Sequence, residues 1–152
     1  FVTIIYIGFT IKNSLENAKN AKLENAAAVT ANADLQNLKA QGINPSYSIS
    51  QYEAWSQSIA QAVGGCSTDT DTINAIFQQM ANTADVLQLV AQFGIRNAQP
   101  CGFSTPISYM IYMFNDKAFG GSLPYLLTWG LSSSALKTVN GILSGKGITY
   151  QF

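Results

Sequence analysis

The residues best suited to chemistry lie in the stretch GGCSTDTDTINAIFQQMAN, which runs from Gly64 to Asn82. Two glycines are followed by hydroxyl side chains and by two carboxylates, Asp69 and Asp71, before an apolar pattern begins. Carbonyl and carboxylate oxygens are the ligands that calcium takes in proteins. The same residues also suit a capped helix start, because a hydroxyl can close the first turn and carboxylates favour its positive end. Of these two interpretations, we favour the capped helix.

The rest of the sequence offers little for catalysis. The 152 residues include no histidine, the side chain used most often for acid–base work near neutral pH and for zinc binding. Cys66 and Cys101 lie far apart without CxxC spacing, and we favour two unpaired thiols over a disulfide. The eight carboxylates are scattered, and no phosphate-binding loop occurs. We therefore expect no enzymatic activity and no bound cofactor.

Charge and composition narrow the class of partner. Eight basic residues balance eight acidic ones, so there is no basic surplus for a nucleic acid backbone. Charged residues make up 11% of the chain and hydrophobic residues 47%, so the surface must rely on uncharged polar side chains. Such a surface suits a protein held in an assembly, with other proteins or with copies of itself.

The first eleven residues, FVTIIYIGFTI, contain no charge and are followed by Lys12. Eleven helical residues cover roughly half of a bilayer, and the chain begins at Phe, so we expect the end of a longer membrane anchor over residues 1–12. The alternative is a buried strand, since Val, Ile, Thr and Tyr favour strands. The polar segment after Lys12 favours the anchor. The residues assigned to it are Phe1, Val2, Ile4, Ile5, Tyr6, Ile7, Phe9 and Ile11.

Residues 13–44 are predicted to form a helical stalk and a linker. The segment up to Gln41 is rich in Ala, Asn, Lys and Leu and contains neither Gly nor Pro, which favours helix. A helix this polar usually bridges between bodies, and about 28 helical residues would reach roughly 40 Å. Gly42 and Pro45 mark its end. Its thin apolar stripe consists of Leu23, Ala27, Ala31, Leu35 and Leu38.

Residues 45–152 are predicted to form a compact bundle of five or six short helices. Predicted helix starts lie at Ser48, Thr68, Thr83 and Thr105, and two further helices are expected near residues 122–130 and 132–143. Glycines at 94 and at 120–121 are predicted helix ends, and the final residues GKGITYQF predict a short strand or a packed, extended tail. The apolar faces of the first three helices are Ile49, Tyr52, Trp55, Ile59 and Val63; Ile73, Ile76, Phe77 and Met80; and Val86, Leu87, Leu89, Val90 and Phe93.

Gly65, Thr68 and Asp69 match the glycine-rich turn G-x-G-T-[DE] that joins two helices. This turn and the helix rhythm after it resemble the annexin-type repeat. The segments SQYEAWSQSI, STDTDTINAIF, ADVLQLVAQFGIR and GITYQF are more closely similar to annexin-like helical domains in proteins of Bacteroidetes and their phages. The resemblance covers residues 45–152 and implies one all-α, annexin-repeat-like head.

The resemblance also implies calcium ligands at Gly65, Thr68 and Asp69. The sequence departs from the annexin pattern because Ser67 replaces the second glycine and because no Asp or Glu lies between residues 103 and 110, where the distal ligand falls. The nearest carboxylate is that of Asp116. We therefore expect a capped helix without a metal ion.

Together, the anchor, the stalk and the head predict a non-enzymatic structural protein. The resemblance to phage domains implies a virion protein of a membrane-containing bacteriophage, anchored in the internal membrane and linking it to capsid or vertex proteins. The alternative is a membrane-anchored binding module of the bacterial cell envelope that depends on calcium or lipid. Arg96, the single arginine of the sequence, is expected to pair with Asp85 or to bind carbonyls at a helix end. The candidate partner contacts are Trp55, Arg96, Tyr109, Tyr112 and Trp129.

Overall fold

The computed structural model describes residues 26–64, 67–97 and 120–152. Within these ranges the chain is all-α, as predicted, apart from one antiparallel pair of two-residue strands. The described elements are α2 (Ala26–Ala40), α3 (Ile49–Gly64), α4 (Thr70–Gln79), α5 (Thr83–Phe93), β1 (Arg96–Asn97), β2 (Gly120–Gly121), α7 (Leu123–Gly130) and α8 (Ser133–Gly145).

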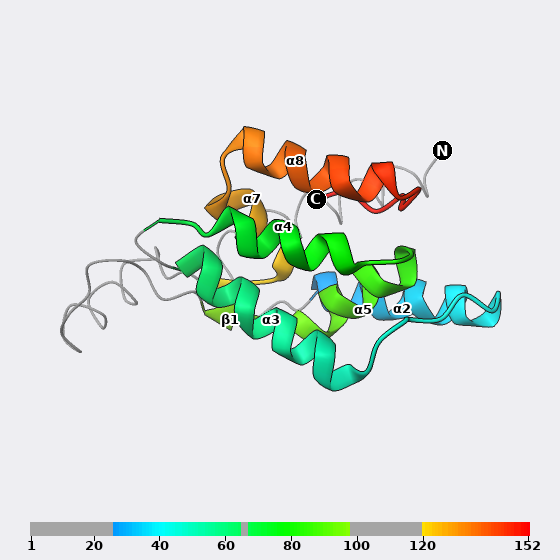
Figure 1. The fold of residues 1–152 in the computed structure, drawn as a ribbon. Coiled ribbons are helices and arrows are strands. Elements are labelled where there is room, and N and C mark those ends of the chain that lie inside the picture. Colours follow the sequence, from blue (N-terminus) through cyan, green and yellow to red (C-terminus); the bar gives the residue numbers. More distant parts are fainter. Residues whose placement is uncertain (1–25, 65–66, 98–119) are drawn as a thin grey trace, which may run out of the picture.

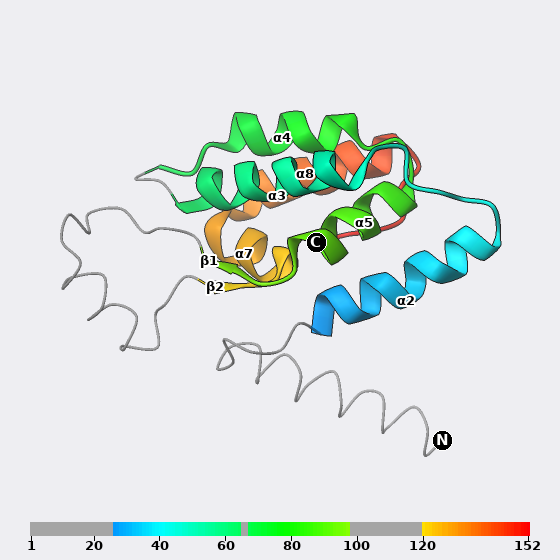
Figure 2. The ribbon, with the colours of Figure 1, turned by 90° about the horizontal axis from the view of Figure 1, so that it is seen from below.

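The helices pack side by side in the order α8, α4, α3, α5 and α2, and α7 packs against α3, α5 and α8 (Figures 1 and 2). Each inner helix turns an apolar face to its neighbours, and the resulting core includes the fully buried side chains of Tyr52, Ile73, Phe77 and Phe93. The predicted faces of α4 and α5 are all buried. On α3, Tyr52, Ile59 and Val63 are buried as predicted, whereas Ile49 is exposed because it lies one turn outside the core.

The helices α3, α4 and α5 begin at short polar side chains, although two of these caps differ from the prediction by one residue. Ser48 accepts a hydrogen bond from the Gln51 backbone N–H, at 3.3 Å, as predicted. The N-cap of α4 is Asp69 instead of Thr68, and the N-cap of α5 is Asn82 instead of Thr83. Both predictions were wrong because two capping residues adjoin each other at each start, and the tertiary contacts of the backbone decide which one caps.

The helix α2 packs against α5 and belongs to the bundle (Figure 2). Ala31 and Leu35 are buried in the core, and Leu35 is only 1% exposed. The predicted apolar stripe is therefore confirmed in the described residues, but the prediction of a stalk that stands clear of the head is wrong for residues 26–40. The physical reason is that the small alanines of the stripe let α5 approach closely, so a thin stripe is sufficient for packing.

The C-terminal tail after α8 is extended and packs against the bundle, which confirms one of the two predicted alternatives. Ile148 is buried, and the Phe152 ring lies edge-on to Phe77 with ring centres 5.2 Å apart. Asn140 of α8 holds the end of the chain with two 2.9 Å hydrogen bonds, one to the Phe152 carbonyl and one from its N–H. The tail thus closes one side of the core.

The strands β1 and β2 bring together two segments that are separated in the sequence. Arg96 lies opposite Gly121 and Asn97 opposite Gly120, so the glycine pair that was predicted to end a helix belongs to a strand. A Cβ atom at residue 121 would overlap the Tyr125 ring, which therefore packs there only because this residue is glycine. Gly94 ends α5 with a positive φ of 57°, as predicted. The helix predicted to start at Thr105 lies outside the described residues.

Candidate partner-contact surface and its supporting polar networks

The turn before α4 is held by contacts within the head. Both carboxylate oxygens of Asp69 accept hydrogen bonds from Thr72, one from its N–H at 3.0 Å and one from its hydroxyl at 2.7 Å. The backbone N–H of Thr72 is the main cause that lowers the pKa of Asp69. The Thr68 hydroxyl donates to the Gly130 carbonyl at the end of α7. Gly65, the third calcium candidate, lies outside the described residues, and within these no group of three His, Cys, Asp or Glu side chains could hold a metal ion.

Asp85 is a buried carboxylate that joins three parts of the fold. Its Oδ1 accepts hydrogen bonds from the Ser46 N–H at 2.6 Å and from the Tyr52 hydroxyl at 2.7 Å. Its Oδ2 accepts from the N–H groups of Ala81 and Asn82, at 2.7 and 3.3 Å. Burial, followed by the hydrogen bond to Asp85, raises the pKa of Tyr52 well above its ordinary value. The carboxylate thereby fixes the start of α3 to the connection between α4 and α5.

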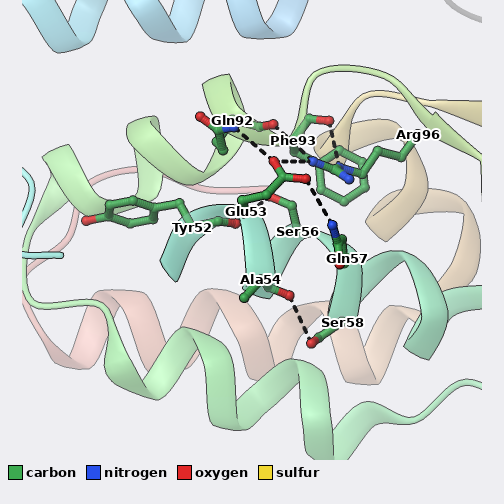
Figure 3. A network of polar contacts seen from close by, with 9 residues as sticks. All are labelled: Tyr52, Glu53, Ala54, Ser56, Gln57, Ser58, Gln92, Phe93 and Arg96. Carbon is green, nitrogen blue, oxygen red and sulfur yellow. Dashed lines mark hydrogen bonds and ion pairs between the residues drawn. The ribbon is translucent and has the colours of Figure 1, made fainter. Parts of the chain in front are cut away.

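A second polar network surrounds Glu53 on α3 (Figure 3). Arg96 Nη2 lies 2.7 Å from Glu53 Oε2, and Gln92 Nε2 donates to the same oxygen at 2.9 Å. Gln57 Nε2 donates to Oε1 at 3.2 Å. Arg96 Nε donates to the Phe93 carbonyl at 3.1 Å, and its guanidinium carbon lies 5.6 Å from the centre of the Phe93 ring. The network joins α3, the end of α5 and β1.

These contacts decide between the two predicted partners of Arg96. The predicted contact with carbonyls at a helix end is confirmed, whereas the predicted pairing with Asp85 is wrong. Asp85 is fully buried and its oxygens are occupied by donors from the surrounding chain, so the guanidinium pairs with the more exposed Glu53. In the described structure, Arg96 thus positions β1 relative to α3.

The Glu53 network predicts a specific dependence of stability on pH. Hydrogen bonding to Arg96, with smaller contributions from Gln92 and Gln57, lowers the pKa of Glu53 from 4.5 to about 2. Because the folded pKa is below the unfolded one, the stabilisation is fully present above about pH 4.5 and is lost as the pH falls towards about 2. We expect the free energy of unfolding to fall less for Glu53→Gln than for the wild type as the pH is lowered over this interval. The measurement is urea unfolding at several pH values.

The control for this measurement is Asp71→Asn, which removes an exposed carboxylate from the first turn of α4. It is expected to retain the acid sensitivity that Glu53 confers. If Glu53→Gln and the wild type lost stability in parallel between about pH 4.5 and about pH 2, the ion pair would not have the role assigned to it.

A set of exposed apolar side chains lies at the connection between α2 and α3. Of the five large hydrophobic residues that are exposed in the described ranges, three fall between residues 43 and 49: Ile43 at 39%, Tyr47 at 37% and Ile49 at 55%. The Tyr47 ring packs edge-on against the half-buried Trp55, with ring centres 4.9 Å apart, and its hydroxyl donates to the Gln79 carbonyl at 2.8 Å. We call Ile43, Tyr47, Ile49 and Trp55 the 43–49 surface. Its two aromatic rings are held in place by contacts within the chain.

The predicted contact residues do not gather at one place. Trp55 belongs to the 43–49 surface, whereas Arg96 binds Glu53, and positions 53 and 55 lie about 160° apart around α3. Trp129 is 51% exposed on α7. Tyr109 and Tyr112 lie outside the described residues.

Two groups of residues in these networks and this surface were not predicted from the sequence. Asp85 was named only as a partner for Arg96, although Asn82 followed three residues later by a carboxylate is a recognisable capping pattern, and both hydrogen bonds of that capping box are present. Ile43 and Tyr47 were not predicted to form a surface, because no local signal distinguishes their exposure from that of other residues in the connection between α2 and α3.

No protein-family model, curated protein or solved structure matches the chain. The predicted membrane anchor, from Phe1 to Ile11, lies outside the described residues, and none of the helices described is both long and apolar enough to cross a bilayer. The anchor and the annexin-like resemblance therefore stay predictions.

Proposed function

We propose that this chain is a non-enzymatic linker protein whose helical head binds a second protein while its N-terminal segment is held in a membrane. In its most specific form, the protein is a virion component of a membrane-containing bacteriophage, anchored in the internal membrane and bound to capsid or vertex proteins. The charge-free start of the sequence supports the anchor. The likeness of residues 45–152 to annexin-like phage domains supports the virion.

The 43–49 surface is the observation that carries the proposed contact with another protein. Tyr and Trp are enriched among the residues that dominate binding energy at protein interfaces. The packing of Tyr47 on Trp55 and its hydrogen bond to Gln79 reduce the side-chain freedom that would otherwise be lost on binding. Full burial of an isoleucine contributes about 1.5–3 kcal/mol, so covering the exposed parts of Ile43 and Ile49 would contribute measurably to affinity.

The position of α2 shortens the link between membrane and head. Because residues 26–40 pack onto α5, the spacer between the proposed anchor and the head is confined to residues 13–25. A fully extended chain of this length reaches about 45 Å, and a helical one roughly 20 Å. The proposed head would therefore lie close enough to the bilayer to contact a protein shell that surrounds it.

The location of the protein is tested with purified virus particles. We expect mass spectrometry to find the chain in virions and, after mild detergent treatment, in the fraction that contains the viral lipid. Recovery from the bacterial envelope, with none in particles, would contradict the virion proposal and favour the cell-envelope alternative. Recovery in the shell fraction without lipid would contradict the anchor.

The contact surface is tested by cross-linking the full chain in its native particles or membranes. We expect Ile49→Lys to reduce cross-linking to the partner by roughly tenfold, which corresponds to the loss of about 1.4 kcal/mol. The matched control is Val29→Lys. Val29 is 67% exposed on α2 and lies roughly 20 Å from Ile43 along the axis of this helix, so it is not part of the 43–49 surface. Equal cross-linking by both variants would show that the partner binds elsewhere.

A further inference from the structure

We propose that a groove between α2, α5 and the C-terminal tail binds a neutral polyhydroxylated ligand, such as a single sugar residue of a glycan. The groove has a volume of about 380 Å³ and opens to solvent. This volume is within the usual range of small-molecule sites, roughly 300–1,000 Å³. The inference concerns a different surface from the 43–49 surface and does not depend on the function proposed above.

The apolar residues that line the groove are packed in or against the hydrophobic core. They include Leu38 of α2 and Leu87 of α5. The Tyr150 ring adds an aromatic face, and it is held by edge-on packing against Phe152, with ring centres 5.0 Å apart. A pyranose ring has an apolar C–H face of similar size. An aromatic ring beside two leucines therefore provides a surface on which this face can stack.

The rim of the groove carries polar side chains from three elements. Asp34 and Asn37 lie three residues apart on α2 and so share one face of the helix, while Thr83 begins α5 and Thr149 lies in the tail. Throughout the described part of the chain, neither these four side chains nor the Tyr150 hydroxyl makes a hydrogen bond to another protein group. The polar networks around Asp85 and Glu53, by contrast, are satisfied internally. The rim therefore keeps its hydrogen-bonding capacity for a ligand.

The chemistry of the rim fits hydroxyl groups. A carboxylate only accepts hydrogen bonds, whereas an amide, a threonine hydroxyl and a phenol can donate them. Burial and the negative charge of Asp34 raise the pKa of Tyr150, so its phenol stays protonated and remains a donor at neutral pH. Neighbouring sugar hydroxyls each donate one hydrogen bond and accept others, which matches a rim that mixes a carboxylate with donors.

Charge disfavours the other ligand classes. Among the described residues, Asp34 is the single charged one that lines the groove, so a phosphate or carboxylate ligand would meet repulsion there without a compensating cation. A divalent cation would find one carboxylate in the described part of the lining, whereas calcium takes six to eight oxygen ligands. A cationic amine could pair with Asp34 but would leave the amide and threonine groups of the rim without a partner.

The test uses the ¹⁵N-labelled full chain and a panel of methyl glycosides of glucose, galactose, mannose and N-acetylglucosamine. We expect at least one glycoside to shift the amide signals of α2, α5 and the tail, with a Kd on the order of 1 mM, because the groove is open and few groups would contact the ligand. No shift with any glycoside would overturn the proposal. An equal or larger shift with tetramethylammonium or inorganic phosphate would also overturn it, in favour of a charged ligand.

Two variants assign the binding to the groove. Asp34→Ala and Asn37→Ala alter exposed side chains, and each is expected to weaken glycoside binding by roughly tenfold while the unfolding transition changes little. Asn32→Ala is the matched control, since Asn32 is an exposed asparagine of the same helix that does not line the groove. Equal weakening by all three variants, or none by Asp34→Ala and Asn37→Ala, would contradict the assignment.

Discussion

Replacing Asp85 by alanine is expected to destabilise the head by about 3–5 kcal/mol. This is a large part of the free energy of unfolding of a typical domain, which is about 5–15 kcal/mol. The carboxylate accepts hydrogen bonds from the N–H groups of Ser46, Ala81 and Asn82 and from the Tyr52 hydroxyl. Hydrogen bonds to a charged group contribute about 1.5–3 kcal/mol each, and a buried donor that loses its acceptor is itself destabilising. The loss should therefore exceed that of any single exposed contact.

The measurement is denaturant unfolding of the full chain, followed by circular dichroism. Asp85→Asn is expected to be intermediate, because its amide oxygen can still accept from Ser46 and Tyr52 while its NH₂ group faces other N–H donors. The control Asp71→Ala removes an exposed carboxylate from the first turn of α4 and should change stability by less than about 1 kcal/mol. An Asp85→Ala protein that unfolded at the same denaturant concentration as this control would contradict the role assigned to the buried carboxylate.

The helices could be predicted from the sequence because their signals are local. Apolar residues recur every three or four positions in α4 and α5, and all the predicted core residues of these helices are buried. The cap of α4 was misplaced by one residue because Thr68 and Asp69 are both able to cap. The choice depends on the fold, in which Asp69 accepts from the Thr72 N–H while the Thr68 hydroxyl donates to the distant Gly130 carbonyl.

The polar networks depend on contacts that the sequence does not show. Glu53 and Arg96 are 43 residues apart, and Ser46 and Asp85 are 39 apart. From charge alone, Arg96 could pair with any of several carboxylates. The fold is what places Glu53 beside it. The groove is equally nonlocal, because Asp34, Thr83 and Tyr150 come from three elements that meet only in the folded chain.

Exposure of the 43–49 surface illustrates a different limit of sequence analysis. The helical spacing places Ile49 on the same face as Tyr52, and it was predicted to be part of the core. Periodicity assigns a residue to a face of a helix, but it does not show where the neighbouring helix ends. Ile49 is the first residue of α3, and its side chain is 55% exposed in the folded chain.

Replacing Leu35 by alanine is expected to destabilise the head by about 2–5 kcal/mol, the usual range for truncating a buried leucine. Leu35 is 1% exposed and belongs to the same core as Tyr52 and Phe77, so its truncation would leave a cavity between α2 and the bundle. The result discriminates between two architectures. A stalk that stands clear of the head would barely respond, whereas a helix packed on α5 would transmit the loss to the whole domain.

The control lies on the same helix. Val29 is 67% exposed, and Val29→Ala should change the free energy of unfolding by no more than about 0.5 kcal/mol, as expected for a surface substitution. Both variants are compared with the wild type by denaturant unfolding of the full chain. If Leu35→Ala proved as mild as Val29→Ala, α2 would not be part of the cooperative unit. The spacer to the proposed membrane anchor would then extend beyond residue 25, and the head could bind its partner farther from the bilayer.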